Sequence, residues 1–165
     1  SEVAGPHLPA QGRDGARSDR GRPPALTMNA LVIDGSITLG FLLKDEQEAI
    51  ALKALHALEK GTKIFVPAHW GVEVANGLIM AERRKRASQA DITEALGLVA
   101  ALPVASDEET TRRACSDTAA LARQYGLTIY DAAYLELAMR CGATLATTDK
   151  ALVAAAKTAG VPILA

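Results

Sequence analysis

The stretch Thr128–Lys150, TIYDAAYLELAMRCGATLATTDK, spans a loop, a helix, a strand and a second loop. Asp131 stands where the Ala-rich helical pattern DAAYLELAMR begins, and Asp149 follows the apolar run Ala143–Ala146, where we expect a strand to end. Either acid alone could be a helix N-cap, because aspartate readily accepts hydrogen bonds from a first helical turn. The stretch therefore predicts an α/β unit, and the question is whether other acids occupy equivalent positions.

The same alternation of short apolar runs and helical patterns continues on both sides of this stretch. The expected strands are 30–33, 63–66, 102–105, 143–146 and 161–164. Helices are expected at 45–58, 88–98 and 151–159, and in the opening stretch from Asp131. Another is expected to start at His69, and a further one to be capped by Ser106 and to end at Gly126. About five strands with helices between them predict a three-layer α/β/α single domain with a central, mainly parallel sheet.

Composition limits the class of protein. The 165 residues are 49% hydrophobic, which suits one packed domain. No apolar run approaches the roughly 18 residues that span a bilayer, and no signal peptide is evident, so we expect a soluble, cytoplasmic protein without a membrane partner. Cys115 and Cys141 lack metal-site spacing and are expected to be buried thiols. The net charge of -1 means that any nucleic acid must be held by a local patch.

The first 27 residues differ from the remainder. They contain four of the seven prolines and four of the thirteen glycines, with almost no large apolar residues. We expect residues 1–27 to be a disordered leader, derived from expression or from upstream read-through, and residues 28–165 to form the domain. A flexible arm whose arginines touch nucleic acid is the alternative.

Two further acids lie where strands give way to helices. Asp34 directly follows the run 30–33, and Glu73 lies one and a half turns beyond the second expected strand. Glu73 shares a helix face with Trp70 and Asn76, and a Glu so close to the core needs a partner. Because active residues of parallel sheets gather at the carboxyl ends of the strands, we expect four acids at one rim: Asp34, Glu73, Asp131 and Asp149.

Carboxylates gathered in this way repel one another, so they must hold either protons or a cation. Oxygen ligands without nearby His or Cys suit Mg²⁺, with Mn²⁺ as the alternative. Such a metal can activate water for in-line attack on a phosphodiester and offset charge on the leaving 3′ oxygen. Ser36, Asn76 and Thr147 would supply hydrogen bonds to the ligands, waters or phosphate.

The motifs LVIDGS, VPAHWGVEVAN, LTIYDAAYLELA and ATTDKAL together resemble the PIN-domain ribonucleases, specifically the VapC toxins of bacterial toxin-antitoxin pairs. The resemblance covers Met28 to the end of the chain. It implies a Mg²⁺-dependent endoribonuclease that acts on RNA, forms a homodimer and is silenced by a VapB-type antitoxin whose C-terminal peptide enters the acidic groove. It also implies that Asp34, Glu73, Asp131 and Asp149 are the acidic cluster. Gly35 stands where the family more often has Ala or Thr, and glycine also fits a tight turn.

Several alternatives stay open. A non-catalytic PIN-like protein-binding module is the main rival, and its mark would be a missing acid. The run 83–86, RRKR, could grip phosphates, but basic residues that close a helix also complement its dipole. Tyr134 is expected to pack rather than to stack on a base, and Glu136 to be solvated or at a subunit contact. His69 is expected to help start its helix, and acid-base chemistry by His56 and His69 without a metal is disfavoured because they lie on separate helices.

Overall fold

The structure is a computed structural model that describes residues 30–43 and 49–165. The expected leader, the expected domain start at Met28 and the start of the helix expected from Asp45 lie outside these residues. None of the described helices is both long enough and apolar enough to cross a membrane.

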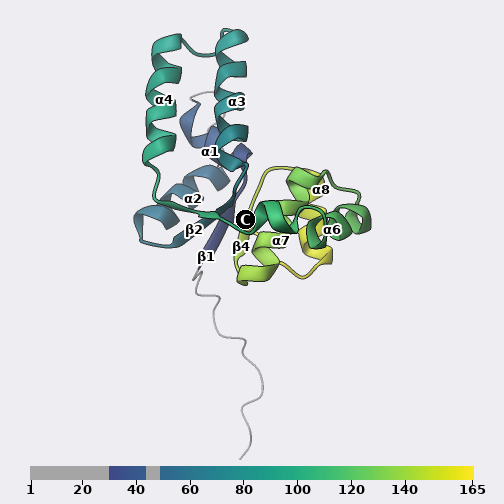
Figure 1. The fold of residues 1–165 in the computed structure, drawn as a ribbon. Coiled ribbons are helices and arrows are strands. Elements are labelled where there is room, and N and C mark those ends of the chain that lie inside the picture. The colour runs from purple at the N-terminus through teal and green to yellow at the C-terminus, as the bar shows by residue number, and fades with distance from the viewer. Residues whose placement is uncertain (1–29, 44–48) are drawn as a thin grey trace, which may run out of the picture.

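Four parallel strands form the sheet at the centre of the molecule (Figure 1). They are β1 (Ala30–Ile33), β2 (Lys63–Pro67), β3 (Val104–Asp107) and β4 (Thr144–Ala146), in the order β3-β2-β1-β4. Val32 of β1 lies opposite Phe65 on one side and Leu145 on the other. The expected strand 161–164 is reduced to a single bridge between Leu145 and Ile163, next to Pro162, which has no N–H to donate to a ladder.

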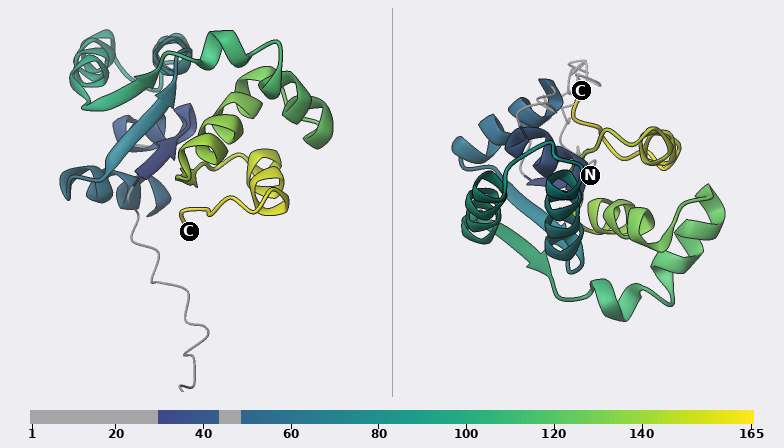
Figure 2. Two further views of the ribbon diagram at one scale, coloured as in Figure 1. Left: turned by 60° about the horizontal axis from the view of Figure 1, so that its bottom comes forward. Right: turned by 90° about the horizontal axis from the view of Figure 1, so that it is seen from above.

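Eight helices flank this sheet within the described part of the chain, and the α/β class with a parallel sheet is confirmed. They are α1 (Gly35–Leu42), α2 (Ala49–Glu59), α3 (Trp70–Arg83), α4 (Gln89–Ala101), α5 (Thr110–Arg113), α6 (Asp117–Tyr125), α7 (Ile129–Cys141) and α8 (Lys150–Thr158). Helix α7 packs across β1, β2 and β4 with α6 against it, while the helices of the N-terminal half lie on the other side of the sheet (Figure 2). Helices α3 and α4 form an antiparallel hairpin that rises above it (Figure 1).

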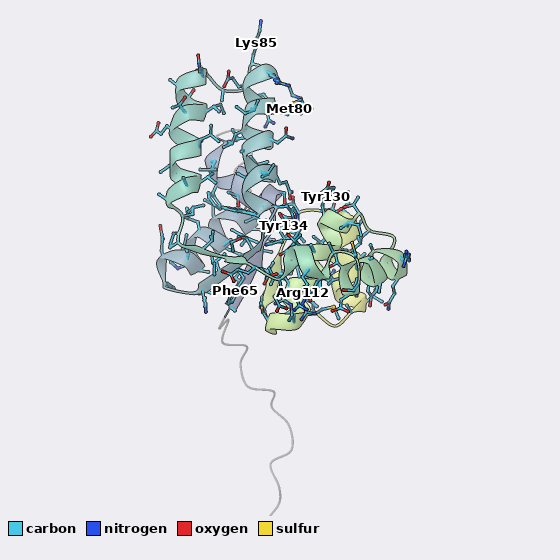
Figure 3. The ribbon with its side chains drawn as sticks, viewed as in Figure 1. Phe65, Met80, Lys85, Arg112, Tyr130 and Tyr134 are labelled. Atoms are coloured by element: carbon cyan, nitrogen blue, oxygen red, sulfur yellow. The ribbon has the colours of Figure 1, made fainter. Side chains whose placement is uncertain are left out.

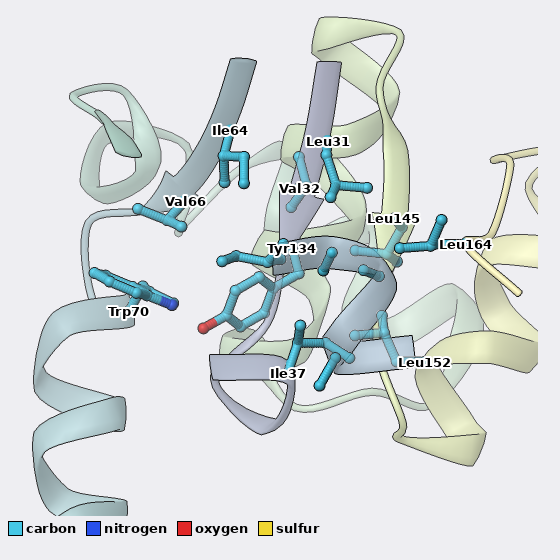
Figure 4. Packing of buried hydrophobic residues seen from close by; sticks show 14 of the residues in the cluster. Leu31, Val32, Ile37, Ile64, Val66, Trp70, Tyr134, Leu145, Leu152 and Leu164 are labelled. Atoms are coloured by element: carbon cyan, nitrogen blue, oxygen red, sulfur yellow. The ribbon is translucent and has the colours of Figure 1, made fainter. Parts of the chain in front are cut away.

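Helix α7 is the buried centre of the fold because its residues Ala132 to Ala138 are all buried. Tyr134 is only 1% exposed and lies among Ile37, Val66 and Trp70 (Figure 4). Its packing role was expected from sequence. A buried aromatic side chain contributes about 1.5 to 3 kcal/mol of transfer free energy, so α7 is fixed firmly against the sheet.

The single helix expected between Ser106 and Gly126 is wrong. Strand β3 continues through Asp107, and the helical segment divides into α5 and α6 at Ser116, whose φ of -124° and ψ of -100° are not helical. The backbone N–H of Ser116 donates instead to the carbonyl of Arg113. Gly126 does end α6, in the left-handed conformation that glycine adopts without strain (φ 66°).

Two further expectations about burial are wrong. Cys115 is exposed in the break between α5 and α6, and Cys141 is only partly buried. Glu136 is not solvated but only 6% exposed, because α6 packs against α7 and Arg113 of α5 lies 3.6 Å from the Glu136 carboxylate. It pairs with Arg140 at 2.8 Å, and Arg140 in turn reaches Asp107 at 2.8 Å.

Candidate metal centre

Asp34 is held at the end of β1, where the chain turns into α1. Its backbone N–H still donates to Ala146 of β4 at 3.1 Å, while its Oδ1 caps α1 by accepting from the N–H of Ile37 at 3.1 Å. The hydroxyls of Ser36 and Thr147 also donate to its carboxylate. Asp34 is only 6% exposed and is fixed by hydrogen bonds of both its backbone and its side chain.

Thr147 joins the two neighbouring strand ends. Besides donating to Asp34, its Oγ1 accepts from the backbone N–H of Asp149 at 3.0 Å. Asp149 caps α8, as the sequence allowed, by accepting from Leu152 N–H at 2.7 Å. The structure therefore links Asp149 to Asp34 through the Thr147 hydroxyl, and the Asp149 side chain is at the surface.

Glu73 approaches the same rim from α3. Its Oε2 accepts a hydrogen bond from the Tyr134 hydroxyl at 2.7 Å, which is the partner that a Glu beside the core requires. Its Oε1 would lie 2.6 Å from a Cβ placed on Gly35, so the absence of a side chain at position 35 lets Glu73 lie close to the start of α1. Its side chain remains 42% exposed and so stays accessible from solvent.

Asp131 lies on the first turn of α7 but does not cap it. The cap is Thr128, whose Oγ1 accepts from Asp131 N–H at 3.1 Å and donates to Asp131 Oδ2 at 2.7 Å. The interpretation of Asp131 as the N-cap is therefore wrong by three residues. Asn76 lies one turn beyond Glu73 on the exposed side of α3, and both line the cavity that Asp131 also lines.

The carboxylates of this rim influence one another electrostatically. Burial raises the pKa of Asp34 above its usual range, although its hydrogen bonds from Ser36 and Thr147 oppose the rise. Burial also raises the pKa of Glu73, and the charges of Asp34 and Asp131 raise it further against the effect of the Tyr134 hydroxyl. Asp34 and Asp131 are thus close enough to Glu73 to repel its carboxylate.

His69, immediately before α3, lines the same cavity as Glu73 and Asp131. Its backbone carbonyl accepts from Glu73 N–H, but its side chain makes no cap hydrogen bond. Its Nε2 is buried without a hydrogen-bond partner and lies 3.7 Å from Glu73 Oε2. Burial lowers the pKa of His69, opposed by the charge of Asp131.

The donor set fits a hard divalent cation in its chemistry. It consists of carboxylate and hydroxyl oxygens, carries repelling negative charge and adjoins an orphaned buried nitrogen. In the described ranges 30–43 and 49–165, however, no three His, Cys, Asp or Glu side chains surround one point in their present rotamers. Glu73 and Asp131 are instead directed to the hydroxyls of Tyr134 and Thr128, so an ion would have to compete with these partners.

The sequence predicted the Ser36 and Thr147 hydroxyls that hold Asp34, but the Thr128 and Tyr134 hydroxyls that hold Asp131 and Glu73 were missed. The pattern T-x-x-D before an Ala-rich helix is a cap signal that could have identified Thr128. Tyr134 lies three residues after Asp131 on the same helix face, but its bond to Glu73 joins positions 61 apart in the chain. No local pattern could have identified that pair.

The family model for the PIN domain matches residues 31–158, and the chain belongs to this family. PIN domains are in general nucleases and typically use divalent metals. A search among curated proteins finds no match.

Solved structures show the same fold at low sequence identity. PAE2754 from Pyrobaculum aerophilum is 22% identical, with a TM-score of 0.60 over 82% of this chain and 83% of that one. VapBC2 from Rickettsia felis, bound to a DNA fragment from their promoter, is 17% identical, with a TM-score of 0.51 over 73% of this chain and 87% of that one. Both similarities show a shared fold.

Proposed function

We propose that this protein is a Mg²⁺-dependent endoribonuclease toxin of the VapC type, with Mn²⁺ as a possible substitute. The observation that carries the proposal is the convergence of Asp34, Glu73 and Asp131 in a PIN-domain fold, where burial raises the pKa of Glu73 and the charges of Asp34 and Asp131 raise it further. Buried carboxylates that repel are costly unless a cation compensates them, and oxygen ligands favour Mg²⁺. The nuclease domain would comprise residues 28–165 and act in the cytoplasm.

Asp34, Glu73, Asp131 and Asp149 would hold the metal directly or through water. A bound Mg²⁺ would supply Lewis-acid stabilisation of a phosphodiester under attack by water. The chain's own contribution is orientation: Ser36 and Thr147 fix the Asp34 carboxylate, and Tyr134 fixes Glu73 from the protein side. Asn76, exposed on α3, would hydrogen-bond to a water or to a phosphate oxygen.

Asp149 has a different position in this scheme. Because its side chain caps α8 and its backbone is joined to Asp34 through Thr147, we propose that it acts at the edge of the cluster. Asp149→Asn should then weaken Mg²⁺ binding less than Asp131→Asn does, as calorimetric titration would measure. Equal losses would instead make Asp149 a direct ligand.

The partners follow from the family resemblance. We propose that the substrate is RNA, that the protein forms a homodimer and that a VapB-type antitoxin inhibits it. The similar fold of the Rickettsia felis VapBC2 toxin-antitoxin assembly supports this proposal. The acidic rim would accept a basic segment of such an antitoxin, because opposite charges meet there.

Expression in a bacterium tests the function. The wild type should arrest growth and create new 5′ ends in cellular RNA, whereas Asp34→Asn and Asp131→Asn should do neither while remaining folded. Glu94→Gln, which removes an exposed carboxylate from α4, is the matched control and should remain toxic. If the wild type and both Asp variants arrested growth equally, the metal-nuclease proposal would be contradicted. A non-catalytic protein-binding module would then be favoured.

A further inference from the structure

A cavity of about 460 Å³ opens beside the acidic rim, between the first turns of α3 and α7. It is lined by His69, Val72, Glu73, Asn76, Thr128, Tyr130 and Asp131. Two of these residues, Glu73 and Asp131, belong to the proposed metal centre. Asn76, Thr128 and His69 adjoin that centre, whereas Val72 and Tyr130 have no role in holding a metal, so the cavity extends the site beyond the acids.

The cavity has exposed apolar walls. Val72 is 75% exposed and Tyr130 is 65% exposed, and both lie in the first turns of helices. Figure 3 shows Tyr130 at the surface next to the buried Tyr134. Exposed apolar residues are ordinary when scattered singly, but an aromatic ring and a branched aliphatic side chain in one cavity form a place where a flat group can be enclosed.

His69 packs against the Tyr130 ring. The two ring centroids are 5.4 Å apart in an edge-on arrangement, and His69 meets Tyr134 in the same manner at 5.3 Å. A restrained aromatic ring loses little conformational entropy when a ligand stacks on it, which favours binding.

We infer that this cavity is a subsite for one nucleobase of single-stranded RNA, stacked on Tyr130 and bordered by Val72, beside the phosphate that is cleaved. The inference rests on the proposed nuclease function. The Asn76 amide and the Thr128 hydroxyl at the same walls can hydrogen-bond to the edge of a base.

The charge of the cavity favours binding of an uncharged base over binding of phosphate groups. The net charge of -1 and the acids at the cavity floor provide no basic field, so the phosphates alone would bind weakly. Stacking on an aromatic ring does not depend on positive charge and accepts every base. A double helix keeps its bases stacked inside, which limits this subsite to single-stranded or looped RNA.

The test uses RNA binding to Asp34→Asn protein in Mg²⁺, so that cleavage is not required. The probe is a single-stranded oligoribonucleotide that carries one 2-aminopurine, whose fluorescence falls when it stacks. Adding Tyr130→Ala should weaken binding by at least roughly fivefold and abolish the quenching, as expected for the loss of one stacked base. Tyr130→Phe should retain both, and Leu98→Ala, which removes an exposed apolar side chain from α4, should change neither.

The outcomes separate the two proposals. Unchanged affinity and quenching in folded Tyr130→Ala would overturn the base subsite and leave this surface to a protein partner, even if the wild type cleaves RNA. If RNA binding depends on Tyr130 but the wild-type protein cleaves no RNA, the base subsite would be supported and the proposed nuclease function would be overturned. In a cleaving enzyme, Tyr130→Ala should raise KM more than it lowers kcat, and the reverse split would contradict a binding role.

Discussion

The ionised Asp34 carboxylate reduces stability in the metal-free protein, because burial raises its pKa. A carboxyl with a raised folded-state pKa binds protons more readily when folded, so its unfavourable contribution appears as pH rises through that pKa. Asp34→Asn keeps an oxygen acceptor for Ile37 N–H and removes the charge. We predict a higher Tm for Asp34→Asn than for wild type at pH 7 in a chelator, together with lost activity.

The difference in Tm should shrink as the pH is lowered, because Asp34 itself then becomes neutral. A lower Tm for Asp34→Asn at pH 7 would show that the carboxylate is stabilised by its hydroxyl partners rather than destabilised by burial.

Tyr134 positions Glu73 through one hydrogen bond at 2.7 Å. Tyr134→Phe keeps the buried ring and leaves the carboxylate unoriented, so metal affinity or activity should fall by about 10- to 100-fold. The free energy of unfolding should fall by only about 1 kcal/mol. Kinetics and Mg²⁺ titration of this variant, compared with Tyr125→Phe on α6, would check the prediction. Equal activity of the two variants would remove Tyr134 from the site.

The positions of the four acids at the ends of strands or starts of helices could be predicted from sequence, because each lies next to a local signal, an apolar run or the start of a helical pattern. Ser36 and Thr147 were predicted as hydrogen-bond donors to the cluster, but which acid each hydroxyl holds was not. Asp34 meets Thr147 and Glu73 meets Tyr134 across 113 and 61 positions of the chain, and only the folded sheet sets these pairs.

Helix α7 begins at a cap that also touches the proposed site. Thr128 accepts from Asp131 N–H and donates to Asp131 Oδ2, whereas Ser88 caps α4 with a reciprocal bond to Asp91, far from the acids. Thr128→Ala and Ser88→Ala should each lower stability by about 1 kcal/mol, measured by urea unfolding. Only Thr128→Ala should change activity. If Ser88→Ala lost as much activity as Thr128→Ala, the lower stability alone would explain the activity loss of Thr128→Ala.

Helices and strands were predicted best where their pattern is local. The runs 30–33 and 63–66 became β1 and β2 with nearly unchanged bounds. The break between α5 and α6 was missed because Ser116 lies in a continuous helical pattern, whereas its N–H and hydroxyl both donate to the Arg113 carbonyl. The strand expected at 161–164 had the right apolar composition but contains Pro162, which limits pairing.

An ion-pair network on the side of α7 away from the acids ties β3 to the core of the molecule. Arg140 bonds to Glu136 and Asp107 at 2.8 Å each, and Thr110 also donates to Asp107 at 2.8 Å. Burial alone would raise the pKa of Asp107, but the hydrogen bonds from Arg140 and Thr110 outweigh it and lower that pKa. The stability that this carboxylate provides is therefore complete above its unfolded pKa of about 3.9 and is lost as pH falls through the lower folded value.

We predict that Asp107→Asn is less stable than wild type at pH 7 and that the difference narrows toward pH 3. Urea unfolding at both pH values measures it, with Asp117→Asn, an exposed acid that pairs with Arg113, as the control. A difference that is constant with pH would show that the charge of Asp107 does not contribute. Activity per folded molecule should be unchanged, because this network lies apart from the rim.

The architecture of the whole molecule was predictable because alternating strands and helices allow few arrangements. The burial of Glu136 was not, because its environment depends on where α5 and α6 cover α7.

The chemistry of RNA cleavage tests the central claim most directly. Purified protein incubated with single-stranded RNA in Mg²⁺ should produce fragments with 5′-phosphate and 3′-hydroxyl ends, because water attacks and the 3′ oxygen leaves. A chelator or the Asp131→Asn substitution should stop cleavage. Cleavage that persists in chelator and leaves 2′,3′-cyclic phosphates, or no cleavage of any RNA in Mg²⁺ or Mn²⁺, would contradict a metal-dependent nuclease at this acidic rim.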